Sequence, residues 1–100
     1  MPLSFDCIIQ GEVPVVVDFF SECCESHVIM QSILHQVKTI AGSMVTVLKM
    51  NISKNEFYAN KYHINAVPTV MIFKNGNILW RKSGLASTQE IIECLAININ

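Results

Sequence analysis

Two adjacent cysteines and a histidine shortly after them are the side chains in this sequence with the clearest capacity for chemistry. Cys23 and Cys24 follow an apolar run, and His27 comes three residues after Cys24. A thiolate is the nucleophile of disulfide exchange, and the free backbone N–H groups and the dipole at a helix N-terminus stabilise it. Because a helix is predicted to begin at Cys24, this cysteine is the candidate nucleophile. The simpler interpretation is a helix-capping cysteine without special reactivity.

His27 is expected on the same face of that helix as Cys24, because residues three apart on a helix are neighbours. A protonated imidazole would stabilise the thiolate, and a neutral one would act as a base. The alternative is a histidine on the helix surface that faces water. A zinc site made of Cys23, Cys24 and His27 is not predicted, because a structural zinc needs four ligands and the sequence offers no fourth one nearby.

The neighbours of Cys24 modify the expected acidity of its thiol. Glu25 suits the first turn of a helix but places a negative charge beside Cys24. Two unit charges about 6 Å apart in a water-like dielectric interact by roughly 0.7 kcal/mol. This effect opposes that of an exposed protonated His27, so we expect the helix end to set the acidity. Cys23 is a candidate accessory thiol, although a disulfide between adjacent cysteines is strained and a small filler residue is the simpler interpretation.

Length and composition exclude several classes of protein. The chain has 100 residues, of which 51% are hydrophobic and 15% charged, with a net charge of −1. These values predict one domain over residues 1–100 and exclude intrinsic disorder. No segment approaches the roughly 20 consecutive apolar residues of a membrane-spanning helix, and the scattered Lys and Arg residues form no basic patch for nucleic acid. The N-terminus lacks the pattern of a signal peptide, so we expect a cytoplasmic protein whose four cysteines stay mostly reduced.

Apolar patterning predicts four strands and four helices. Three runs rich in β-branched and aromatic residues predict strands covered on both faces, and a fourth strand follows the third. The strands are expected at residues 13–20, 44–52, 67–74 and 78–82. Helical periodicity and capping signals predict helices at residues 3–10, 24–41 and 53–62 and from residue 87 onward. The last two begin with the predicted capping boxes Ser53–Glu56 and Ser87–Glu90.

The connections between these segments predict a mixed sheet and an α/β fold. Asn75-Gly76 between two apolar runs is typical of a type I′ turn, so the last two strands should be antiparallel. The first two strands are joined by a crossover helix, which Gly42 can end in the left-handed conformation, and should be parallel. Cys7 and Cys94 are expected to be buried on helix faces, where a free cysteine packs as a small apolar residue.

Several segments, in the right order and spacing, resemble the thioredoxin family from about residue 4 to residue 96. They are residues 17–24 (VDFFSECC), residues 61–69 (KYHINAVPT), and residues 73–76 (FKNG) followed by Gly84. The resemblance implies a thioredoxin-like fold with a central mixed sheet flanked by helices. The family has a strand before its first helix, which is missing here, so we expect a four-stranded sheet with an exposed edge. The protein would then be a monomer or a weak dimer.

The same resemblance assigns roles around Cys24, which takes the position of the family's nucleophile. His27 stands where the family has the second cysteine, which resolves the mixed disulfide between enzyme and substrate. Without that cysteine, the mixed disulfide should persist until an outside thiol attacks it. Glu25 and Ser26 replace the usual Gly-Pro, which makes the rim of the docking surface less apolar.

The resemblance also extends to residues outside this motif. Asp18 and Lys49 match a buried Asp–Lys pair, in which the carboxyl group has a raised pKa and shuttles a proton for the resolving cysteine. Because that cysteine is absent here, the alternative is a pair that remains only because removing one partner of a buried pair is costly. Pro68 matches a cis-proline that faces the active cysteine and lets the backbone beside it pair with a substrate strand. The resemblance therefore implies a set of substrate-binding residues: Ala66, Val67, Pro68, Gly84, Glu25 and Ser26.

Two functions follow from these assignments. The first is a thiol–disulfide oxidoreductase that acts through the single thiol of Cys24 on disulfide-containing proteins, with a small thiol such as glutathione as its reductant and without a metal or other cofactor. The second is a redox-inactive binding module that holds an extended peptide beside the proline by strand addition. The fold alone does not choose between them.

Overall fold

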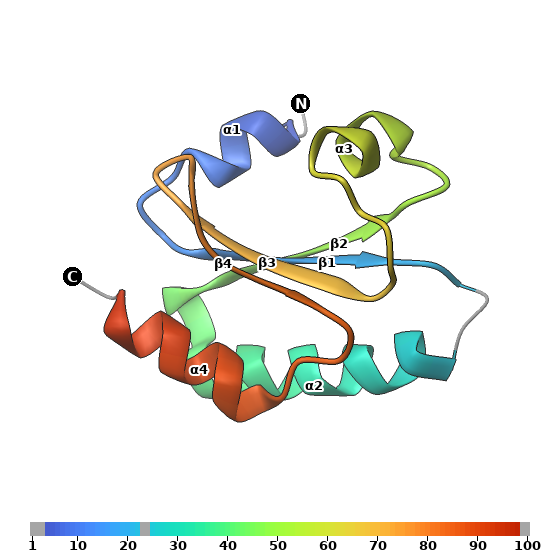
Figure 1. Cartoon of the computed structure of the whole chain (residues 1–100). Coiled ribbons are helices and arrows are strands. Elements are labelled where there is room, and N and C mark those ends of the chain that lie inside the picture. The colour runs from blue at the N-terminus through green and yellow to red at the C-terminus, as the bar shows by residue number, and fades with distance from the viewer. Residues whose placement is uncertain (1–3, 23–24, 99–100) are drawn as a thin grey trace.

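The computed structural model describes residues 4–22 and 25–98 of the chain. A sheet lies between two layers of helices, with α1 and α3 on one face and α2 and α4 on the other (Figure 1). The helices are α1 (Phe5–Ile9), α2 (Glu25–Ala41), α3 (Glu56–Lys61) and α4 (Thr88–Ile97), with a 3₁₀ turn, η1 (Gly42–Met44), after α2. This layered arrangement confirms the predicted α/β class.

The sheet has four strands among the described residues, in the order β2-β1-β3-β4. They are β1 (Val15–Phe20), β2 (Thr46–Asn51), β3 (Thr69–Lys74) and β4 (Asn77–Ser83). β1 runs parallel to β2 and antiparallel to β3, and β3 and β4 form an antiparallel hairpin. Asn75 and Gly76 both have positive φ values, 53° and 79°, as the predicted type I′ turn requires. The predicted strand directions are therefore confirmed.

The two faces of β1 belong to two separate apolar clusters. Val16 packs with residues of α2 and α4, whereas Val15, Val17 and Phe19 pack with residues of α1 and α3. Side chains along a strand alternate between the faces, so Asp18 points to the same side as Val16, toward the layer of α2 and α4. The strand pairing thereby determines which helix layer covers the carboxyl group.

β2 was expected to be covered on both faces, and this expectation is wrong. Its residues are mostly half-buried, and Lys49 is exposed, because β2 lies at the edge of the sheet and has a neighbouring strand on one side only. The predicted burial of Cys7 is also wrong, since this residue is exposed on the short helix α1. Cys94 on α4 is half-buried.

The predicted capping box at α3 does not form. The helix begins at Glu56 after Asn55, whose side chain makes no capping bond. Ser53 Oγ instead donates to Asn51 Oδ1 at 2.7 Å, so a competing side chain at the end of β2 takes the hydroxyl group. Gly42, by contrast, has φ 57° directly after α2, as predicted for a helix-ending glycine.

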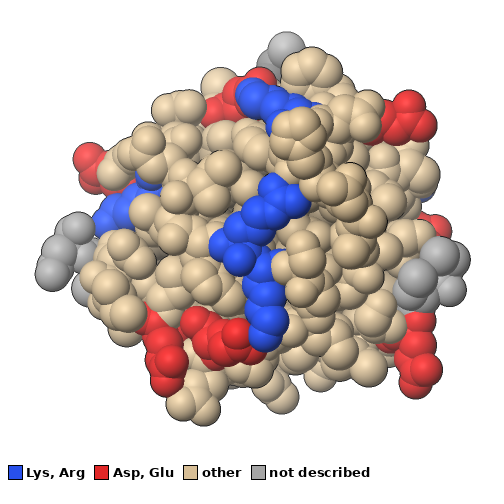
Figure 2. Space-filling view, in the orientation of Figure 1, with Lys and Arg blue, Asp and Glu red and all other residues tan. Residues whose placement is uncertain are grey.

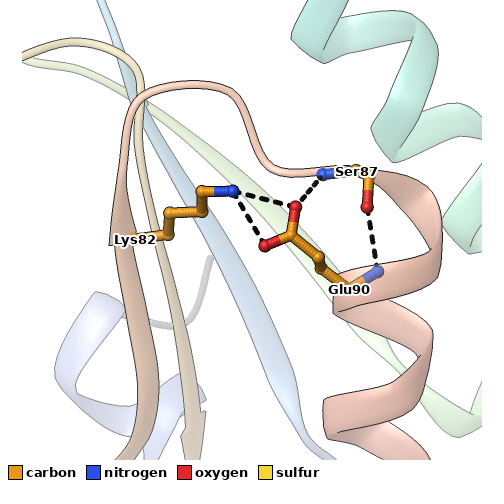
Figure 3. Close-up of polar contacts among 3 residues, drawn as sticks. All are labelled: Lys82, Ser87 and Glu90. Carbon is orange, nitrogen blue, oxygen red and sulfur yellow. Dashed lines mark hydrogen bonds and ion pairs between the residues drawn. The ribbon is translucent and has the colours of Figure 1, made fainter.

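Lys and Arg side chains gather in a stripe across the face of the molecule on which β4 lies in front, and acidic side chains adjoin the stripe (Figure 2). Lys82 on β4 forms one such contact, because its Nζ lies 2.8 and 2.9 Å from the two carboxylate oxygens of Glu90 on α4 (Figure 3). Glu90 also completes the predicted capping box. Ser87 Oγ accepts a bond from Glu90 N, and Glu90 Oε1 accepts one from Ser87 N, both at 3.0 Å. One carboxylate therefore ties β4 to the first turn of α4.

Replacing Ser87 by alanine should lower the free energy of unfolding by about 1 kcal/mol, the usual cost of a lost N-cap hydroxyl. The measurement is urea denaturation followed by circular dichroism. Ser43→Ala is the matched control, because Ser43 is exposed in η1. Equal stability of the two variants would contradict a role for the capping box.

Candidate functional site

Two of the residues predicted to carry chemistry, Asp18 on β1 and His27 in the first turn of α2, lie on the two elements that meet at one corner of the fold. β1 ends at Phe20 and α2 begins at Glu25. Cys23 and Cys24, the predicted accessory thiol and nucleophile, lie outside the described residues. Glu25 is exposed, and Ser26 is half-buried, both in the first turn of α2. The geometry of this corner is therefore built from Asp18 and Phe20 on β1 and from the first turn of α2.

His27 is held against β1 by an aromatic contact. Its ring stacks on the ring of Phe20 with centroids 4.3 Å apart and an interplanar angle of 9°. His27 is half-buried, and its Nδ1 atom is buried with no hydrogen-bond partner among the described residues. The side chain thus has a defined orientation, with one ring nitrogen turned away from water.

Asp18 is the buried ionisable group of this corner. Its side chain has no exposed surface, and neither carboxylate oxygen has a hydrogen-bond partner among the described residues. Burial raises the pKa of Asp18 from 3.8 to about 6, and the positive charge of Lys49 opposes part of this rise. A carboxyl group with such a pKa can both release and take up a proton near neutral pH.

Lys49 is the partner of Asp18 in the register of β1 and β2, as the predicted pair requires, but it is not buried. The predicted burial of the lysine is wrong because β2 is an edge strand, which leaves the ammonium group access to water. Lys49 therefore acts on Asp18 through its charge, while the carboxylate oxygens stay without a bonded partner in the described part of the chain.

The proline segment lies at the same end of the sheet as Phe20. The peptide bond between Val67 and Pro68 is cis. Phe19 pairs with Thr69 across β1 and β3, so Pro68 comes level with the end of β1. Gly84, with φ 94°, donates from its backbone N–H to Pro68 O at 2.7 Å.

Two of the predicted substrate-binding residues precede this proline. Ala66 is exposed and Val67 is half-buried, and Thr69 Oγ1 donates to Ala66 O at 2.6 Å. Together with the bond from Gly84 to Pro68, these contacts gather Ala66, Val67, Pro68 and Gly84 at one place.

Sequence reasoning missed two contacts that hold this region. One is the stacking of Phe20 on His27. The sequence signal that could have revealed it is an aromatic residue at a strand position that faces α2, close to the start of that helix. The other is Arg81 on β4, whose guanidinium donates to the backbone oxygens of Tyr62 and His63 before the proline segment. His63 has φ 52°, which is in the left-handed region.

Residues 4–22 and 25–98 contain neither a metal-binding cluster nor a membrane-spanning helix. This part of the chain contains no group of three or more His, Cys, Asp or Glu side chains that could hold a metal ion. The group of Cys23, Cys24 and His27, which was considered as a zinc site and not predicted, lies mostly outside the described residues. Within the same part, none of the helices has the length and apolar character needed to cross a membrane.

The burial of Asp18 should make folding stability depend on pH. Its folded pKa is raised, so the full contribution to stability is present below the unfolded pKa of 3.8 and is lost as pH rises through the folded value of about 6. The shift corresponds to a loss of about 3 kcal/mol across this range. Asp18→Asn should remove this loss. The free energy of unfolding of the variant should therefore fall less between pH 4 and values above about pH 6 than that of the parent protein.

Urea denaturation at a series of pH values measures this effect. Glu12→Gln is the matched control, because Glu12 is exposed and the same carboxyl-to-amide change there should leave the pH profile of the parent protein intact. A parallel pH profile for Asp18→Asn and the parent would contradict the raised pKa.

Comparisons with known proteins identify one family. The family model Thioredoxin matches residues 2–96. A thioredoxin of Rickettsia bellii is 38% identical over 92 residues, which cover 92% of this chain and 88% of the relative. Thioredoxin Y2, chloroplastic, of Arabidopsis thaliana is 34% identical over 91 residues, covering 90% of this chain and 54% of the relative.

A solved structure of thioredoxin-2 from the malaria parasite is also similar. It superposes with a TM-score of 0.81 at 25% identity and covers 85% of this chain and 82% of that one. With the family model matching nearly the whole chain and the Rickettsia relative covered almost in full, this protein belongs to the thioredoxin family.

Proposed function

We propose that the protein is a thiol–disulfide oxidoreductase that works through one thiol, that of Cys24. Membership of the thioredoxin family supports a thioredoxin-like redox function. The observation that carries the single-thiol mechanism is His27. This residue stands three positions after Cys24 in the first turn of α2, stacks on Phe20, and brings an imidazole rather than a second thiol to the site.

The proposed reaction has two exchange steps. In the first, the Cys24 thiolate attacks one sulfur of a substrate disulfide, so that a Cys24–substrate disulfide forms and the substrate disulfide breaks. The second substrate sulfur leaves with the electron pair and takes up a proton. In the second step, the thiolate of an outside thiol such as glutathione attacks the substrate sulfur of this mixed disulfide. Cys24 is released as the thiolate, and a disulfide between the substrate and the small thiol is formed.

His27 and Asp18 are the groups proposed to handle charge and protons during these steps. A protonated His27 would stabilise the Cys24 thiolate, and a neutral one would accept the thiol proton. Asp18, with a pKa of about 6, is the buried group proposed to exchange a proton with the leaving thiolate. Lys49 would tune Asp18 through its positive charge, which opposes part of the rise that burial causes in the Asp18 pKa.

The substrate is proposed to lie as an extended segment along the residues gathered by Pro68. The backbone of Ala66 and Val67, Pro68 itself and Gly84 would hold this segment, with Glu25 and Ser26 on the opposite rim. Partners would be proteins with accessible disulfides, in a reducing compartment such as the cytoplasm. The electrons come from the small thiol, so the reaction needs no metal or other cofactor.

Cys24→Ser should abolish the fast formation of a mixed disulfide with a model disulfide, leaving only the slower reaction of other thiols such as Cys7. The measurement is the mass of the protein after incubation with oxidised glutathione, followed over time. Cys7→Ser is the matched control, because Cys7 is an exposed thiol outside the site and its loss should leave the fast reaction intact. A Cys24 thiol that reacts no faster than Cys7 would defeat the proposal.

His27→Cys should increase the reduction of insulin disulfides above the low activity of the parent protein, because a second thiol at this position can release the mixed disulfide from within the chain. His35→Cys is the matched control, since it adds a thiol to the exposed side of α2 away from the first turn. Equal, negligible activity of both variants and the parent would favour the binding module. In that case, capture of partner proteins should survive Cys24→Ser.

A further inference from the structure

The outer edge of β2 presents unpaired backbone groups. Thr46 N donates to Pro14 O at 2.9 Å and Ile52 N donates to Phe20 O at 3.0 Å, so alternate residues of β2 bond to β1. The residues between them direct their N–H and C=O groups to the other side, where no strand lies among the described residues. These residues are Val47, Lys49 and Asn51.

Only part of this edge is open to a partner. Asn51 O accepts bonds from Lys54 N at 3.1 Å and from the side chain of Asn55 at 2.9 Å, so the turn after β2 closes that end. Val47 and Lys49 remain, each with an outward donor and an outward acceptor. Two such residues two positions apart match the hydrogen-bonding pattern of one short added strand.

The groove on one side of this edge is positively charged. It runs between α2 and β2 and is lined by Gln31, Leu34, His35, Lys38, Thr46, Val47 and Lys49. Lys38 Nζ is held in place by Gly42 O at 2.9 Å and Val45 O at 2.6 Å, and Lys49 is exposed. The lining contains no acidic side chain, so an added strand would meet two ammonium groups on this face.

The other side of the edge is more apolar. Leu48 and Met50 point to this side and pack against the cluster of α1 and α3. A hollow at the start of β2 is lined by Cys7, Ile8, Gly11, Glu12, Val13 and Thr46. Successive side chains of an added strand would therefore meet the lysines and an apolar surface in turn.

We propose that the β2 edge binds an extended segment of a partner protein in which acidic residues alternate with apolar ones. The backbone of this segment would pair with Val47 and Lys49. Its carboxylates would face Lys38 and Lys49 in the groove beside α2, and its apolar side chains would face the α1 side. A second copy of the chain fits less well, because it would bring the same lysines next to these ones.

This surface does not involve Cys24, so it can be tested apart from the redox proposal by using the Cys24→Ser protein throughout. The probe is a short, end-blocked peptide of alternating glutamate and valine, and binding is measured by calorimetry and by NMR of the backbone amides. The expected result is salt-sensitive binding that shifts the amides of Val47 and Lys49 more than that of Leu48. A lysine–valine peptide of the same alternation, and a peptide of the same composition with glutamates and valines in two blocks, should bind at least tenfold more weakly.

Two variants separate the backbone and charge contributions. Val47→Pro removes an outward N–H while keeping the bonds to β1, so it should abolish binding, with urea denaturation as the check that the protein is folded. Lys49→Glu should weaken binding about tenfold, because it reverses one of the two charges that face the carboxylates of the peptide. Lys54→Glu, the same charge change beyond the end of β2, should not. Binding that survives Val47→Pro in the folded protein, equal binding of the lysine–valine peptide, or a dimer in sedimentation that Val47→Pro dissociates would overturn the proposal.

Discussion

The burial of β1 on every side is the constraint on which the rest of the structure depends. The strand is paired on both edges, and Val15, Val16, Val17, Asp18 and Phe19 are each at most 1% exposed. Since the pairing sets the alternation of side chains, it holds the carboxyl group of Asp18 inside the fold with no exposed surface. The same alternation brings Phe20 to the side of α2, where its ring meets His27. One buried strand therefore supplies both the perturbed carboxyl group and the platform for the imidazole.

The edge position of β2 explains why Asp18 and Lys49 have such different environments although they are partners in the strand register. β1 is central, so the carboxyl group loses its hydration, whereas β2 has a free side, so the ammonium group keeps it. A solvated charge acts on its neighbour through a higher effective dielectric than a buried one. The charge of Lys49 can thus lower the pKa of Asp18 without returning this pKa to its ordinary value. The pKa of the carboxyl group stays at about 6.

Much of the fold could be predicted from the sequence, because its signals are local. Apolar runs, the Asn75-Gly76 turn, the glycine after α2 and the capping box at Ser87 all act over a few residues, and the structure confirms each of them. The failures depend on distant neighbours. The burial of β2 depended on whether another strand lies beside it, which an apolar run cannot show. The cap at Ser53 depended on competition from Asn51 for the same hydroxyl group. At the site, Asp18 was recognisable as a charge within an apolar strand, whereas the stacking of Phe20 and His27 joins two elements and has no local pattern.

The contact between Phe20 and His27 also sets a limit on how freely the site can change. An aromatic pair in parallel contact contributes about 0.5–1.5 kcal/mol beyond the area that it buries. A smaller side chain at position 27 would give up this energy and leave one face of the Phe20 ring uncovered. The imidazole is therefore part of the packing between β1 and α2 as well as a candidate for the chemistry of Cys24. Because the two roles share one ring, a second thiol at this position would come with weaker attachment of the first turn of α2. A matching change at Phe20 would be needed to restore it.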